Sequence, residues 1–159
     1  MSLKADIEAA FPKLNPDSAG FFPDEASDDE MRQLAGDISS FYIDDVPPFL
    51  GALLYWSARN PPNEAWSLER LIYYLNANLE APFFAGVGMG RGADEVENER
   101  RQRMERQREF ERLTPAQITA VRDWLAEAQT WPSMKPLAHE VADARGYWNQ
   151  LAARVRLSK

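Results

Sequence analysis

The chain has 159 residues, of which 45% are hydrophobic, so it is long enough for one domain with a substantial core. It contains no cysteine, which excludes disulfides, thiolate metal sites and a cysteine nucleophile. Its net charge of −7 lies in the N-terminal half, because residues 1–92 hold 14 acids and 6 bases.

This charge distribution bears on the kind of partner the chain can bind. A negative field disfavours nucleic acid and anionic membranes, and it favours a basic protein. No apolar stretch reaches the roughly 18 residues of a membrane span, and the N-terminal segment lacks the apolar run of a signal peptide. We therefore expect a cytoplasmic protein with no membrane or nucleic-acid partner.

The N-terminal half predicts a series of helices with clear start signals. Ser2 can cap a first helix, and Ser27 with Glu30 forms a capping box for a second. Residues 44–60 predict a buried third helix, because this segment is rich in Leu and Ala and stops at a double proline. Ser67 can cap a fourth helix. Its predicted apolar face consists of Leu68, Leu71, Ile72, Leu75 and Leu79.

Glycines at alternate positions, from Gly86 to Gly92, precede a run of alternating acids and arginines. They do not form a phosphate-binding loop, because no Lys-Ser or Lys-Thr pair follows, and they miss the sixth position of the dinucleotide fingerprint. We interpret residues 83–95 as a flexible Gly-rich loop and residues 96–113 as a charged, solvated helix. Interleaved glutamates offset its arginines, which argues against a nucleic-acid surface.

Two further helices complete the chain. Thr114 and Gln117 form a capping box with Pro115 at the first helical position, and this helix is expected to end before Pro132. The last predicted helix carries apolar residues at alternating spacings of four and three, which is typical of a bundle. These residues are Leu137, Val141, Ala144, Trp148, Leu151 and Val155. Gly146 within it predicts a weakened helix with close packing or a kink.

These patterns predict an all-α fold. We expect residues 1–159 to form a single-domain bundle of about six or seven helices with a Gly-rich hinge loop. No run of residues alternates as a strand would, and the chain contains no internal repeat.

The sequence offers no catalytic signature. His139 is the only histidine, and the position four residues later, where a zinc protease has its second histidine, is Asp143. A loose metal site with Glu140 is the alternative, but a surface histidine is favoured. Most of the tryptophans fit helical core spacing. We predict no catalytic residue, no metal and no cofactor.

The acids before and within the second and third helices are explained first by capping and by the helix dipole. They also form a candidate face for a protein partner. The predicted partner-binding residues are Asp24, Glu25, Asp28, Asp29, Asp44 and Asp45.

Three segments resemble an uncharacterised family of small bacterial proteins, a domain of unknown function. They are "IEAAFP" near the start, "DDVPPFLGALLYW", and "FERLTPAQITAVRDWLAE" after the loop, so the likeness spans roughly residues 5–128. The resemblance implies a bacterial source and a small helical protein whose gene can lie beside polymorphic toxins. No catalytic residue comes with it.

We therefore expect a non-catalytic protein-binding module, most concretely an immunity-type protein that neutralises a basic toxin domain with its acidic face. A regulatory or scaffold protein without a toxin partner is an alternative, and a small metal-dependent enzyme is a third.

Overall fold

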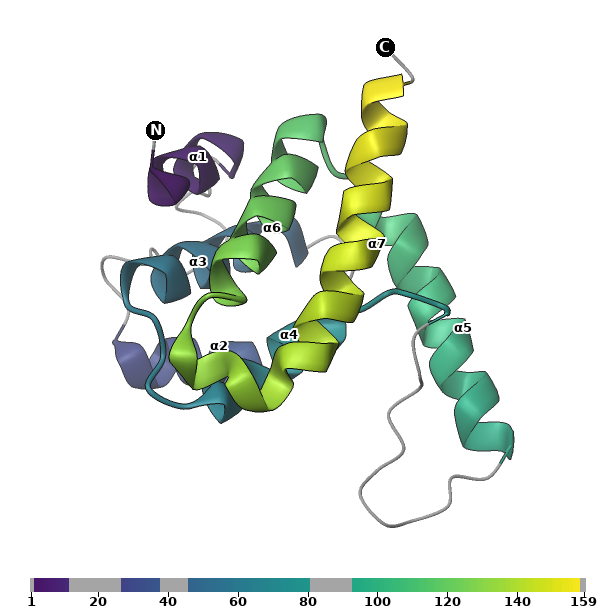
Figure 1. Ribbon diagram of the computed structural model, residues 1–159, viewed down its shortest axis with the longest axis horizontal. Helices are drawn as coiled ribbons and strands as arrows, with labels where there is room; N and C mark the ends of the chain where they lie inside the picture. The colour runs from purple at the N-terminus through teal and green to yellow at the C-terminus, as the bar shows by residue number, and fades with distance from the viewer. Residues whose placement is uncertain (1, 12–26, 38–45, 81–92, 158–159) are drawn as a thin grey trace.

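The computed structural model describes residues 2–11, 27–37, 46–80 and 93–157, and this part of the chain contains helices and no strands (Figure 1). The all-α prediction is therefore confirmed. The helices are α1 (Leu3–Ala10), α2 (Asp28–Asp37), α3 (Val46–Arg59), the 3₁₀ helix η3 (Ala65–Leu68), α4 (Glu69–Leu75), α5 (Ala93–Phe110), α6 (Pro115–Ala128), the 3₁₀ helix η4 (Pro132–Leu137) and α7 (Ala138–Leu157).

The long C-terminal helices form the centre of the bundle. α6 and α7 lie side by side, and α1 packs against both α3 and α6 (Figure 1). α2 packs against α3, η3 and α4, while α4 also contacts α7. α5 lies at the edge of the molecule (Figure 1). Within the described residues, no helix is long and apolar enough to cross a membrane.

The predicted apolar faces of α6 and α7 are buried in one core. Trp124 and Trp148 are its largest fully buried side chains. The indole N–H of Trp124 donates to Ser57 Oγ at 3.0 Å, and the Ser57 hydroxyl donates to the Leu53 carbonyl at 2.7 Å. Both polar groups are thus paired away from water, which removes most of the cost of burying them.

Three of the predicted helix starts are confirmed by their capping contacts. Ser2 Oγ accepts a hydrogen bond from the Ala5 amide, and Ser27 Oγ accepts one from the Glu30 amide. The capping box of Thr114 is complete in both directions, with Pro115 in the first turn of α6. Such caps satisfy amides that have no partner inside the helix.

The fourth predicted helix differs from the structure at both ends. Ser67 does not cap it, because residues 65–68 form η3 and α4 begins only at Glu69. Leu79 is not on its face, because the helix ends at Leu75. The asparagines that follow explain this early end. Asn76 Oδ1 accepts from the amide of residue 78 at 3.4 Å, and Asn78 Oδ1 accepts from the amide of residue 80 at 3.0 Å. These local bonds compete with a further helical turn.

The charged segment is also shifted. α5 spans Ala93–Phe110, so it begins and ends three residues earlier than the predicted helix over residues 96–113. The predicted hinge loop lies outside the described residues except for residues 93–95, which belong to α5.

Two helical glycines have very different surroundings. A Cβ atom on Gly51 of α3 would overlap the Cβ and Cγ atoms of Phe11, at the end of α1. At Gly146 of α7, a Cβ atom would meet only the Asn78 amide nitrogen at 3.8 Å, an ordinary contact. The close packing predicted at Gly146 is therefore absent, and the glycine that packing requires is Gly51.

We expect opposite effects from alanine at these two positions. Gly51→Ala should lower the free energy of unfolding by about 1–2 kcal/mol, since the Phe11 Cβ moves only with its backbone and overpacking outweighs the gain in helix propensity. Gly146→Ala should raise it by up to about 1 kcal/mol, because alanine is the better helix former. Urea unfolding of both variants measures the two changes, and a stabilised Gly51→Ala variant would show that α1 does not lie against α3.

Candidate functional site

The predicted acidic face is only partly within the described residues. Asp24, Glu25, Asp44 and Asp45 lie outside them. Asp28 and Asp29 are exposed in the first turn of α2, followed by the exposed Glu30. The helix dipole stabilises all three carboxylates there.

The two described acids of the prediction have different contacts. Asp28 Oδ1 accepts a hydrogen bond from the Trp56 indole N–H at 2.9 Å, which ties the start of α2 to α3. Asp29 pairs with Arg32 at 3.2 Å, but its side chain is 94% exposed, so this ion pair contributes little to stability. Asp28 thus has a structural role, whereas Asp29 presents its charge to solvent.

One tryptophan departs from the predicted core role. Trp66 of η3 is 65% exposed, whereas the other tryptophans are buried. The η3 helix packs against α2, the helix that carries Asp29 and Glu30. The described part of the chain therefore presents a large aromatic side chain and an acidic helix start on neighbouring elements.

The arginines of α5 have a role that the sequence did not predict. Arg103 is 3% exposed, and its guanidinium donates to the Asn78 carbonyl at 2.6 Å and to Glu99 at 3.3 Å. Arg106 donates to the Tyr73 carbonyl at 3.0 Å. The prediction of a solvated α5 is wrong for this face, because these arginines bind the backbone at and just beyond the end of α4.

The same region receives two further side-chain donors. Gln107 of α5 donates to the Ala77 carbonyl at 2.7 Å, and the Trp148 indole of α7 donates to the Leu75 carbonyl at 2.9 Å. Carbonyls at a helix C-terminus lack intrahelical partners, and positive charge there is favoured by the dipole. α5 and α7 together therefore add side-chain donors to carbonyls of the α4 segment. Two of these carbonyls also accept local backbone N–H groups, Tyr73 from Asn76 at 3.2 Å and Leu75 from Ala77 at 3.0 Å.

Aromatic rings pack together beside these polar contacts, at the end of α5. Phe110 packs edge-on against Tyr74 with ring centroids 5.3 Å apart, and its ring centroid lies 4.7 Å from that of Trp148. The Tyr74 hydroxyl donates to Glu109 at 3.5 Å, and burial raises the pKa of Glu109. Burial lowers the pKa of Arg106, whose guanidinium lies over the Tyr74 ring. The end of α5 is thus anchored by an apolar contact beside its polar ones.

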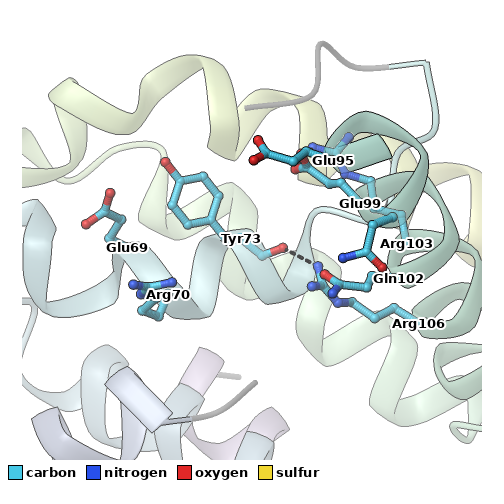
Figure 2. A pocket seen from close by; sticks show the side chains of 9 residues that line it. Glu69, Arg70, Tyr73, Glu95, Glu99, Gln102, Arg103 and Arg106 are labelled. Carbon is cyan, nitrogen blue, oxygen red and sulfur yellow. Dashed lines mark hydrogen bonds and ion pairs between the residues drawn. The ribbon is translucent and has the colours of Figure 1, made fainter. Parts of the chain in front are cut away.

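A groove of about 520 Å³ lies between α4 and α5, and Figure 2 shows its lining side chains. They are Glu69, Arg70, Tyr73, Glu95, Asn98, Glu99, Gln102, Arg103 and Arg106. The groove is a polar concave surface with carboxylates and guanidinium groups on its walls. Its size is within the range of small-ligand sites, although such sites are usually more apolar.

Tyr73 lies in this groove with an altered titration. Burial, and then the negative charges of Glu69 and Glu140, raise its pKa to about 12, and the opposing effect of Arg70 is smaller. Tyr73 therefore remains a neutral phenol at physiological pH, with a negative field around it.

The described residues contain no group of three or more His, Asp or Glu side chains placed to hold a metal ion. His139 is exposed in the first turn of α7, as the surface interpretation predicted. The charged and polar side chains that line the groove suit a ligand that binds through ion pairs and hydrogen bonds.

Comparison with known proteins adds no relative, since no family model, no curated protein and no solved structure matches the chain.

The groove lining was not among the predicted site residues. Arg103, Arg106 and Phe110 follow one another at spacings of three and four, which places them on one helix face. Phe110 is the signal that could have shown this face to be buried. The acceptors on the α4 segment, however, are backbone carbonyls. Every residue has one, so the sequence does not show which of them accept a side-chain hydrogen bond.

We expect Arg103→Met to lower the free energy of unfolding by about 2–3 kcal/mol. Methionine keeps much of the packed volume but removes the guanidinium that donates to the part-buried Asn78 carbonyl and pairs with Glu99. Arg101→Met, on the exposed side of the same helix, should change it by less than about 0.5 kcal/mol. Urea denaturation with matched m-values measures both. Equal stability of the two variants would mean that Arg103 does not hold α5 against α4.

Proposed function

We propose that the protein is a non-catalytic protein-binding module whose acidic surface contacts a basic partner, such as an immunity-type protein that occludes the active site of a toxin domain. The observation that carries this proposal is the exposed Trp66 on η3, next to the helix that presents Asp29 and Glu30.

The chemistry of these groups supports protein recognition. Tryptophan is enriched among interface residues that contribute most of the binding energy, because it buries a large rigid area at low entropic cost. Acidic side chains around such an anchor attract a basic partner and raise its association rate. The N-terminal half of the chain carries the excess of acids that this requires.

The charge of the acidic surface can be tested by reversal. Asp24→Lys with Glu25→Lys should slow association with the partner and weaken its salt dependence, because these residues precede the Ser27 cap and the change leaves that cap intact. The melting temperature should stay nearly the same. The measurement is a pull-down from the source cell or with the product of the adjacent gene, followed by association kinetics at two salt concentrations.

A matched control separates local charge from net charge. Glu8→Lys with Glu127→Lys makes the same change in net charge at exposed positions on α1 and α6, and should leave association nearly unchanged. If both double variants behave as wild type does, or no partner is captured, the acidic surface has no binding role and a scaffold without a toxin partner becomes the better proposal.

The aromatic anchor can be tested independently. Trp66→Ala should weaken binding by about 2 kcal/mol, mainly through faster dissociation, because the alanine removes buried contact area from the complex. Stability should change little, since Trp66 is 65% exposed. Leu157→Ala is the control, because Leu157 is an exposed apolar residue on the last turn of α7. Similar affinity of both variants would remove Trp66 from the interface.

A further inference from the structure

The groove between α4 and α5 begins close in the sequence to Trp66 of the proposed interface. Glu69, which lines the groove, is three residues after Trp66, and α4 follows η3 directly. A partner that covers Trp66 therefore lies close to Glu69, a residue of the groove lining. The question is which chemical group the groove accepts.

The arginines in the wall are already used by the fold. Arg103 and Arg106 direct N–H groups at the carbonyls of Asn78 and Tyr73, and Arg103 also pairs with Glu99. The Tyr73 carbonyl lies in the last turn of α4, where the negative end of the helix dipole offsets part of the Arg106 charge. Each guanidinium thus directs at least one N–H group to the backbone of the α4 segment.

The α4 wall presents the aromatic ring of Tyr73 beside the carboxylate of Glu69, and Glu95 lies on the α5 wall. In Figure 2 the Tyr73 ring lies between the carboxylates of Glu69 and Glu95. An aromatic face beside carboxylates is the combination that binds ammonium and guanidinium groups, through the ring quadrupole and through ion pairing.

The titration of Tyr73 supports a negative field at this wall. After burial, the largest contributions to its raised pKa come from Glu69 and Glu140, and they exceed that of Arg70. A cation placed beside the ring would meet the attraction of Glu69 and Glu140, which Arg70 opposes at Tyr73, and Arg103 and Arg106 are the further positive charges in the groove lining.

We propose that this groove is a binding site for a cationic side chain, a lysine or arginine of the basic partner, held between the Tyr73 ring and the carboxylates of Glu69 and Glu95. This assignment rests on the proposed function for the identity of the partner, but the site itself can be tested without it.

The probe is N-acetylarginine amide, which carries one guanidinium and no other charge, and its control is N-acetylcitrulline amide, a neutral analogue of similar shape. Titration is followed by amide chemical shifts of the folded wild-type protein at low salt. The arginine probe should shift signals of residues 69–73 and 95–102 with saturation, and the citrulline probe should not.

Variants then show whether the probe binds in the groove or is attracted by the overall negative charge of the protein. Glu69→Gln and Glu95→Gln should each weaken the arginine probe by about fivefold, the effect expected of one partly exposed ion pair. Arg70→Gln should strengthen it, because it removes the opposing charge. Glu97→Gln is the matched control, since Glu97 is exposed on α5 but does not line the groove.

Several outcomes would overturn the assignment. They are equal binding of the citrulline probe, equal weakening by Glu97→Gln, absence of shifts around the groove, or saturable shifts there with inorganic phosphate in place of the cation. A failed pull-down with intact probe binding would reject the protein partner and keep the cation site. Partner capture that is unaffected by Glu69→Gln and Glu95→Gln would keep the module and reject the groove.

Discussion

The arrangement of the N-terminal half against the C-terminal half depends on how the backbone at the end of α4 satisfies its carbonyl oxygens. α4 is only two turns long, and it ends against asparagines that turn the chain away. Local N–H groups reach the carbonyls of Tyr73 and Leu75, and carbonyls at and beyond the last turn take further partners from other helices. Side chains of α5 and α7 provide them. The pairs are Arg106 with Tyr73, Trp148 with Leu75, Gln107 with Ala77, and Arg103 with Asn78. Because each such hydrogen bond contributes about 0.5–1.5 kcal/mol, these contacts help to fix where α5 and α7 meet α4.

This requirement explains why such a charged helix belongs to the fold. The described residues of α5 are mostly polar, so apolar burial holds it mainly near Phe110. Its long side chains reach the α4 segment while the backbones stay apart, and the space left between them is the groove. The groove is polar for the same reason, because the residues that span it are those that hold the two helices together. The groove proposed as a binding site lies where α5 is attached to the α4 segment.

Local signals in the sequence predicted the helices well, and contacts between distant segments account for what it missed. The capping box at Thr114 is complete within four residues, and the stripe from Val141 to Leu151 lies on a single helix, so both are readable without knowledge of a partner. The early end of α4 depends on Asn76, whose side chain competes with the helix in a way that apolar periodicity does not record. The buried state of Arg103 depends on a carbonyl 25 residues away, and backbone acceptors look alike in every sequence. The alternating acids and arginines of α5 were therefore interpreted as a solvated helix.

At Tyr73 the backbone carbonyl serves the fold, while the side chain lines the groove proposed as a binding site. Arg106 holds Tyr73 through its carbonyl oxygen, so the fold depends on the backbone at this position while the ring faces the groove wall. The same division applies at α2, where Asp28 secures the helix through Trp56 and the adjacent Asp29 presents its carboxylate to solvent. Substitutions at Glu69, Tyr73 or Asp29 can therefore change the charge and shape of the surface without removing the contacts that position α2, α4 and α5. A module that binds partners needs this independence, because its surface can then be altered at nearly constant stability.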